Sequence, residues 1–228
     1  MLNIHFILVE PAVPENIGAA ARAIKTMGFK SLRLVKPANH LADEARWLAH
    51  ASNDILEGAE VFNTLSEATR DIDWIVGTTA KKRKVNQDYY PANTLNEMIR
   101  AKSSTIKNLA LVFGREESGL TNEELSLCHT VTSIPMKTSY PSLNLAQSVM
   151  IYAYSLSMLE IEKTEAEDEK NENEFSALKN KVEKIVTEMG FKPNTAIYNR
   201  IMERLNVLGK TDIHLLHSVC NKLNEKKY

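Results

Sequence analysis

The sequence predicts an α/β protein with a parallel sheet covered by helices on both faces, followed by a small helical extension. Two observations carry this prediction. Short apolar runs typical of buried strands alternate with amphipathic helical repeats over residues 1–160. The stretch Asn108–Leu125 joins an apolar run, a polar turn between Gly114 and Gly119, and a helix start. Such a strand–loop–helix transition is where open α/β sheets place their ligand sites.

Apolar or alternating runs bounded by proline, glycine or polar turns predict the strands. We expect strands, in chain order, at Asn3–Glu10, Ser31–Val35, Val61–Phe62, Asp73–Thr78, Leu109–Phe113 and Thr130–Ile134. The polar, basic stretch Lys81–Pro91 has no periodicity, and Ala51–Asp54 is rich in turn-forming residues. Both are therefore expected to be loops.

Apolar residues at helical spacing predict the helices. The expected helices lie at Ile17–Met27, Leu41–His50, Leu65–Arg70, Thr94–Lys102 and Ser142–Ile161, with a further one starting after Thr121. Thr121 and Glu124 have the spacing of a capping box, and Gly28 is a typical helix end. Ser142 is the expected N-cap of the last helix, with Asn144 at its second helical position.

Composition divides the chain into a sheet domain at 1–160, an acidic linker at 161–174 and a helical domain at 175–228. Residues 162–174 carry seven acids and two bases, a net charge of −5. Residues 175–228 carry ten bases and five acids, and apolar stripes begin at Leu178, Ile197 and Ile213. The basic domain fits a polyanionic partner, although a solvated surface with surplus lysines explains the charge equally well.

The remaining composition narrows the class of protein. The 228 residues contain no apolar run near the length of a membrane span, and the N-terminus lacks a basic region before its first strand. The two cysteines are far apart and the six histidines form no cluster. We expect a cytoplasmic protein without a membrane segment and without a metal.

Three strand-to-helix transitions hold the candidate site residues. Each has a simpler structural explanation. The segment Glu15–Arg22 could be close helix packing with a surface arginine. The loop Gly114–Gly119 could be a tight turn with solvated charges, and it is not a P-loop because no Gly-Lys-Ser/Thr follows. Ile134-Pro135 and Ser142-Leu143-Asn144 could mark an ordinary cap after a loop.

The order of these motifs is more informative. The chain reads Asn-x-Gly-x-x-x-Arg at 16–22, Leu-Val-Phe-Gly-x-Glu-x-x-Gly-Leu at 111–120, then Ile-Pro-Met at 134–136 and Ser-Leu-Asn-Leu-Ala at 142–146. This series resembles the three signature motifs of the SpoU class of RNA ribose methyltransferases, in the SPOUT superfamily. Thr78-Thr79-Ala80 before basic residues, and more loosely the helical tail, resemble its TrmJ-like branch.

The resemblance implies features that no local pattern shows. The sheet domain would close in a C-terminal trefoil knot formed from about Leu109 to Leu156. S-adenosylmethionine (SAM) would bind in the knot, and the enzyme would be a homodimer in which Arg22 reaches the partner's cofactor site. The expected cofactor-binding residues are Thr78, Thr79, Ala80, Gly114, Ile134, Ser142 and Leu143.

The resemblance implies 2′-O-methylation of a ribose, most simply in a tRNA anticodon loop. A ribose hydroxyl reacts poorly unless its proton is removed or its developing charge is stabilised. The expected catalytic residues are Arg22, Glu116, Ser142, Asn144 and Asn16. Arg22 would hold the phosphate beside the ribose and stabilise the alkoxide or accept the proton, and Glu116 would orient Arg22 or another basic group. Ser142 and Asn144 would hold the RNA backbone, and Asn16 would bridge the cofactor loop and the substrate.

A basic run follows the expected cofactor loop directly. Lys81, Lys82, Arg83 and Lys84 are expected to contact RNA, and Tyr89-Tyr90 could stack on unpaired bases. The alternative is a solvated loop.

Four other functions compete with this interpretation. A nicotinamide enzyme, or a methyltransferase of the Rossmann type, needs a glycine-rich turn after the first strand; Glu15-Asn16-Ile17-Gly18 does not supply one. An rRNA 2′-O-methyltransferase and a non-catalytic RNA-binding protein of the same fold remain open.

Overall fold

The computed structural model describes residues 2–80, 89–102, 105–138, 142–159, 168–193, 195–205, 208 and 210–225. The chain forms two compact units. One contains Leu2–Asn96 and Asn108–Glu160, and the other contains Glu97–Lys107 and Ile161–Tyr228. The candidate site lies wholly in the first unit.

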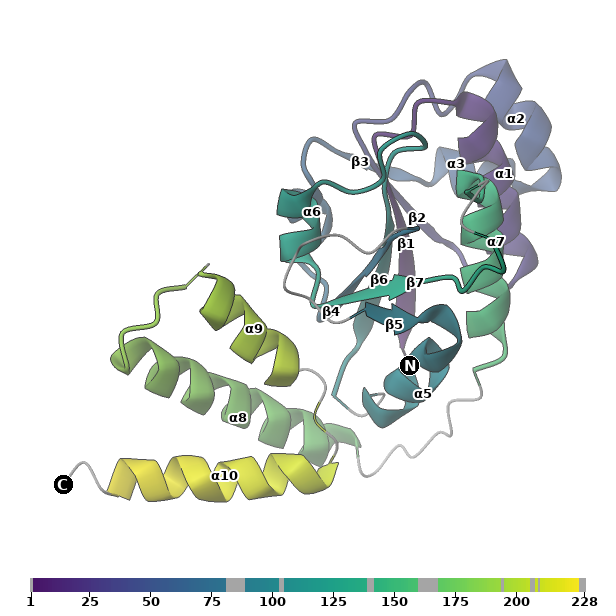
Figure 1. Cartoon of the computed structure of the whole chain (residues 1–228). Helices are drawn as coiled ribbons and strands as arrows, with labels where there is room; N and C mark the ends of the chain where they lie inside the picture. The colour runs from purple at the N-terminus through teal and green to yellow at the C-terminus, as the bar shows by residue number, and fades with distance from the viewer. Residues whose placement is uncertain are drawn as a thin grey trace. The chain divides into compact units, whose positions relative to one another are not determined.

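A seven-stranded sheet forms the centre of the first unit, in the order β3-β2-β1-β6-β4-β7-β5 (Figure 1). Every neighbouring pair of strands is parallel. The strands are β1 Asn3–Val9, β2 Ser31–Val35, β3 Glu60–Phe62, β4 Trp74–Thr78, β5 Tyr89–Pro91, β6 Asn108–Phe113 and β7 Thr130–Ser133. Because all strands run the same way, the loops after β4, β6 and β7 emerge at one edge of the sheet.

Both faces of the sheet are buried, which explains the nearly continuous apolar runs in β1, β4 and β6. On one face, Phe6 of β1 stacks on Phe113 of β6, and Tyr152 meets Phe113 edge to face. On the other face, Ile7 and Val112 belong to a core cluster that also includes apolar side chains from α4 and α6.

Helices cover both faces (Figure 1). The helices of this unit are α1 Pro14–Thr26, α2 Asp43–Ala49, α3 Asn53–Glu57, α4 Leu65–Ala68, α6 Asn122–Leu127 and α7 Leu145–Ser157. Helix α1 packs on α2, α3 and α7, and this group lies on the side of the sheet opposite α6. The predicted α/β fold is therefore confirmed. The trefoil knot stays a prediction of the family resemblance.

Gly18 sets the closest approach of α1 to α2. A Cβ atom at Gly18 would lie 2.0 Å from the carbonyl oxygen of Ala45 in α2. Ala20 and Ala21 are fully buried on the same helix. The small residues of α1 thus serve packing within the chain, so they are no evidence for an interface with a second copy.

Three local predictions were wrong. Helix α7 begins after Asn144, which is its N-cap, and not at Ser142. Residues 53–57 form helix α3 where a turn was expected, and residues 89–91 of the predicted basic loop form strand β5, which pairs with β7. Helix α3 and strand β5 were missed because each is only a few residues long, and β5 also depends on pairing with a strand distant in sequence.

Besides most of helix α5, Leu95–Lys102, the described part of the second unit contains α8 Asp168–Glu188, α9 Ala196–Leu205 and α10 Lys210–Glu225. Phe175, Leu178, Ile213 and Cys220 form its buried cluster. Helix α8 begins inside the predicted linker, and residues 161–167 lie outside the described residues. The boundaries proposed at 160 and 175 remain predictions. The short helical turns His50–Ser52 and Ala92–Thr94 complete the elements.

None of the helices in the described ranges combines the length and hydrophobicity that a membrane span requires.

Candidate active site

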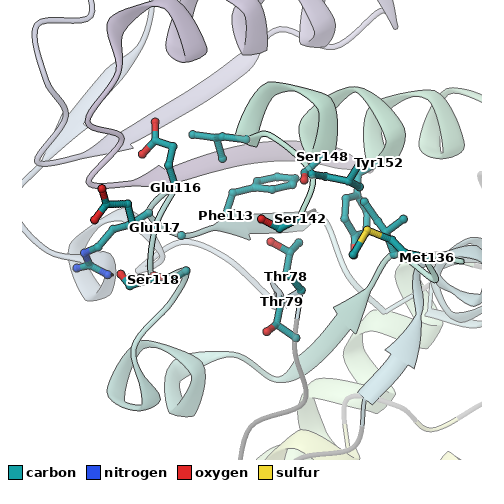
Figure 2. A pocket seen from close by; sticks show the side chains of 17 residues that line it. Thr78, Thr79, Phe113, Glu116, Glu117, Ser118, Met136, Ser142, Ser148 and Tyr152 are labelled. Atoms are coloured by element: carbon teal, nitrogen blue, oxygen red, sulfur yellow. Dashed lines mark hydrogen bonds between the residues drawn. The ribbon is translucent and has the colours of Figure 1, made fainter. Parts of the chain in front are cut away.

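A cavity of about 310 Å³ opens at the carboxyl edge of the sheet, between the ends of β4, β6 and β7 and the start of α7. Figure 2 shows Thr78, Thr79 and Ser142 in the middle of its lining, with Tyr152 and Met136 at one end and Glu116 at the other. All seven expected cofactor-binding residues line it: Thr78, Thr79, Ala80, Gly114, Ile134, Ser142 and Leu143. The volume is within the range of about 300–1,000 Å³ of small-molecule sites.

The loop after β6 forms one wall of this cavity and closes on itself. Arg115 and Gly119 exchange backbone hydrogen bonds, with N···O distances of 3.3 and 2.9 Å. Gly119 has a φ of +69°, a conformation that glycine adopts without strain. A Cβ at Gly114 would lie 2.1 Å from the carbonyl carbon of Gly119. Gly114 therefore makes room for the returning loop of its own chain.

Gly114→Ala is expected to distort this loop, because the new Cβ would collide with backbone atoms of Gly119 and Leu120, which cannot move aside as a flexible side chain could. We expect a loss of stability of about 2 kcal/mol, as for other overpacked sites, together with loss of ligand binding in the cavity. Gly28→Ala is the matched control: its φ of +85° makes alanine costly, but no atom lies within 4 Å and Gly28 does not line the cavity. Thermal melts and SAM titration of both variants test this. Normal SAM affinity in Gly114→Ala would contradict it.

Arg115 anchors the loop through ion pairs with two glutamates. Its guanidinium donates to both carboxylate oxygens of Glu124, at 2.9 and 3.0 Å, and to Glu10 at 2.9 Å. Hydrogen bonds to Glu124 and Glu10 raise the pKa of Arg115, while the bond from Arg115 lowers the pKa of Glu10. Glu124 also completes the predicted capping box with Thr121, which is confirmed. The loop is thus held by charged groups from both sides.

A chain of hydrogen bonds connects the three sequence motifs. Asn144 Nδ2 donates to Asn16 Oδ1 at 2.8 Å, and Asn16 Nδ2 donates to Glu116 Oε1 at 3.0 Å. The Glu116 carboxylate also accepts from the backbone N–H groups of Ala12 and Val13, at 3.1 and 3.4 Å. Val13 is the N-cap of α1 and provides no side-chain cap itself. Glu116 therefore caps α1 from another part of the chain.

These contacts change the role expected for Glu116. Among the described residues of one chain, the Glu116 carboxylate bonds to Asn16 and the start of α1 rather than to an arginine. Burial would raise the pKa of Glu116, but the hydrogen bonds from Asn16, Ala12 and Val13 outweigh it and hold the pKa below its ordinary value. The carboxylate is thus ionised at neutral pH and attracts the positive end of the α1 dipole.

Asn144 caps α7 through two bonds. Its side chain accepts from the N–H of Ala146 at 2.8 Å, and Gln147 reaches back to the N–H of Asn144 at 3.1 Å. The sequence contained this signal, because Gln147 lies three residues after Asn144, whereas Leu145 lies three after Ser142 and cannot close a capping box. Ser142 lies outside the helix and lines the cavity.

Arg22 is exposed on α1 and is not among the residues lining the cavity of its own chain. The structure thus brings together Asn16, Glu116, Asn144 and Ser142 but leaves Arg22 apart. Lys81, Lys82, Arg83 and Lys84 lie outside the described residues. Tyr89 packs against the core cluster that contains Ile7 and Val112. Its ring is therefore less available for stacking on a base than the sequence suggested.

Sequence reasoning missed about half of the cavity lining. The additional lining residues are Phe113, Arg115, Glu117, Ser118, Gly119, Met136, Leu145, Ser148 and Tyr152. Most lie within three residues of a predicted residue in the sequence, but Ser148 and Tyr152 come from successive turns of α7. Helical spacing from Asn144 was the signal that could have found them.

Comparison with known proteins now identifies the family. The model described as the SpoU rRNA Methylase family matches residues 3–154. The chain belongs to the SpoU methylase family. A second model, tRNA/rRNA methyltransferase LasT, C-terminal domain, matches residues 172–227. The resemblance inferred from the three motifs is therefore confirmed, and the basic helical unit is a recognised module as well.

Relatives of this SpoU methylase extend over its whole length. The protein named "Uncharacterized tRNA/rRNA methyltransferase LasT" from Escherichia coli is 40% identical over 224 residues, covering 98% of each chain. The tRNA (cytidine/uridine-2′-O-)-methyltransferase TrmJ of Yersinia enterocolitica is 37% identical over 164 residues, which cover 72% of this chain and 63% of TrmJ.

Two solved structures show the same fold. A probable methylase family protein from Haemophilus influenzae has a TM-score of 0.69 and 31% identity, with 99% of this chain and 97% of that chain covered. The SpoU methyltransferase AviRb from Streptomyces viridochromogenes, solved with AdoMet, has a TM-score of 0.54 and 22% identity, covering 68% of this chain and 59% of that chain.

Within the described ranges, no group of three or more His, Cys, Asp or Glu side chains could hold a metal ion.

Proposed function

We propose that this SpoU methylase transfers the methyl group of SAM to the 2′-hydroxyl of a nucleotide in a tRNA anticodon loop. The single observation that carries the proposal is the convergence of the three family motifs on one cavity, through the bonds between Asn144, Asn16 and Glu116. The ribose specificity and the tRNA substrate are supported by the similarity to TrmJ, whose name states both.

The cavity suits SAM by its chemistry. It offers hydroxyl groups of Thr78, Thr79 and Ser142, the backbone of the loop at Gly114, and the apolar side chains of Ile134 and Leu143. Backbone and hydroxyl groups can hold an adenine edge and a ribose. When bound, SAM supplies an activated methyl group. The chain therefore has mainly to position the two reactants.

The acceptor hydroxyl has to lose its proton as the O–CH3 bond forms. Arg22 is the residue proposed to hold the neighbouring phosphate. It would either stabilise the alkoxide while the proton passes to water, or accept the proton itself when perturbed by that phosphate. Glu116 acts at a distance from this proton: it fixes the start of α1, the helix that carries Arg22 two turns later. Ser142 and Asn144 position the RNA backbone at the mouth of the cavity.

The proposed enzyme is a homodimer. Arg22 is separated from the cavity of its own chain, so a second copy would have to supply it. Helix α7 presents Ile151, Tyr154 and Met158 outward, at 37%, 56% and 56% exposure, with the spacing of one helical face. Helix α1 packs on α7, so Arg22 lies on a helix adjoining this apolar face. The two cysteines are free and buried, in keeping with the cytoplasmic setting that we propose.

An rRNA substrate is the second candidate, because the family description names rRNA and the name LasT leaves both open. The test is to incubate the purified protein with labelled SAM and either unmodified tRNA or rRNA transcripts. Nuclease digestion should yield a 2′-O-methylated dinucleotide from the tRNA anticodon loop. SAM binding without transfer to either RNA would favour the non-catalytic alternative.

Neutralising Lys81, Lys82, Arg83 and Lys84 together, by glutamine, is expected to weaken RNA binding and its salt dependence. The slope of log K against log salt should fall by about 1 for each phosphate that the variant no longer neutralises. SAM affinity should not change. Filter binding at several salt concentrations measures the slope, and an unchanged slope would show that these side chains do not contact phosphate.

A further inference from the structure

The floor of the cavity contains a buried phenol to which the proposed function assigns no role. Tyr152 of α7 lines the cavity but is only 1% exposed. Figure 2 shows its ring at the end of the cavity away from Glu116. A buried tyrosine hydroxyl normally has a hydrogen-bond partner. That partner indicates which part of the structure the hydroxyl stabilises.

The partner is the hydroxyl of Thr132 in β7, at 2.8 Å. Thr132 is completely buried, and its Oγ1 lies 3.5 Å from the carbonyl oxygen of Gly77 in β4. Its own carbonyl oxygen accepts the N–H of Thr79 at 3.0 Å. The phenol of Tyr152 is therefore hydrogen-bonded to Thr132, the residue whose own hydrogen bonds join the ends of β4 and β7.

The backbone that Thr132 holds is part of the expected cofactor site. Thr78 pairs with Thr132 in the sheet, and Thr79 follows it into the cavity lining. The Tyr152 ring also packs edge-on against Phe113, with 5.6 Å between ring centroids. Phe113 precedes Gly114, the first residue of the opposite wall. One side chain thus contacts both walls.

Tyr152 is unsuited to proton transfer from the ribose. Burial raises its pKa to about 12, and the hydrogen bond with Thr132 only partly offsets this. The hydroxyl thus remains protonated at neutral pH, and its hydrogen bond is made with Thr132.

We propose that Tyr152 is a positioning residue for the cofactor: its hydroxyl, through Thr132, holds the Thr78–Ala80 backbone in the conformation that binds SAM. The inference rests on the proposed function, because it takes SAM as the occupant of the cavity. It assigns to the pair Tyr152–Thr132 an effect on cofactor affinity and none on RNA recognition.

The test compares Tyr152→Phe, Thr132→Val and the double variant by calorimetric titration with SAM. Loss of one buried hydrogen bond should weaken SAM binding up to about tenfold. The KM for SAM should rise by the same factor, with kcat at saturating SAM changed less than about twofold. The double variant should be no weaker than the worse single variant, because both remove the same bond. Thr132→Ser, which retains the hydroxyl, should restore binding.

Tyr198→Phe is the matched control. Tyr198 is also largely buried, and its hydroxyl donates to Glu183 at 2.5 Å, but it belongs to the helical unit and does not line the cavity. It should leave SAM affinity unchanged even if it lowers the melting temperature. Unchanged affinity in both Tyr152→Phe and Thr132→Val, or equal weakening in Tyr198→Phe, would overturn the inference. Failure of the wild-type protein to bind SAM would instead overturn the proposed function.

Discussion

Arg22→Ala is expected to lower the rate of methyl transfer about a thousandfold, as does removal of other groups that stabilise charge in a transition state. The fold and SAM affinity should be retained, because Arg22 is exposed and does not line the cavity of its own chain. Arg22→Lys should recover only part of the rate, since lysine lacks the planar fork that binds phosphate with two hydrogen bonds. Single-turnover rates with saturating SAM measure the effect.

Arg70→Ala is the control for this prediction. Arg70 is also an exposed arginine of the sheet unit, but it follows α4 and does not line the cavity. Its removal should leave the rate of methyl transfer within about twofold of the wild-type rate, because most surface substitutions have small effects. A near-normal rate in Arg22→Ala would remove this residue from the mechanism.

Mixing two inactive variants tests whether Arg22 acts on the partner's site. Arg22→Ala and Asn144→Ala should each be inactive as homodimers. If Arg22 acts across the dimer, each mixed dimer contains one site with a normal Asn144 and a normal Arg22, and random reassortment should restore about a quarter of the activity. If Arg22 acts within its own chain, no mixed dimer has an intact site and activity stays absent.

Glu116→Ala is expected to lower kcat about a hundredfold. The substitution removes the acceptor for Ala12, Val13 and Asn16 at once, and these groups lose charge-assisted hydrogen bonds. The start of α1 would then shift, and with it Arg22, and an error of about 1 Å in positioning can cost such a factor. SAM affinity should fall less than kcat.

Glu116→Gln distinguishes charge from shape. The amide of glutamine retains one acceptor oxygen, so the kcat of Glu116→Gln should lie between those of the wild type and Glu116→Ala. Glu123→Gln is the control: Glu123 lies in the first turn of α6 and does not line the cavity. Equal rates for Glu116→Ala and the wild type would show that capping of α1 by Glu116 is irrelevant to catalysis.

Much of the site could be predicted because its residues follow strand ends. In a parallel sheet these ends share one edge, so Thr78, Gly114 and Ile134 were expected at the same edge once the strands were recognised. The bonds between motifs could not be predicted from patterns. Asn16 and Glu116 are 100 residues apart, and Asn144 and Asn16 are 128 apart. Their contact depends on strand order and on the packing of α1 against α7.

The sequence alone determined the class of fold, the family and about half of the residues that line the cavity, since these depend on local periodicity and motif order. Only the tertiary structure decided what each residue does there. Gly114 makes room for Gly119, and Glu116 caps a helix that lacks a cap of its own. Tyr152 reaches Thr132 across the core. Hydrogen bonds and close contacts join atoms in space, and spacing along the chain does not specify which atoms those are.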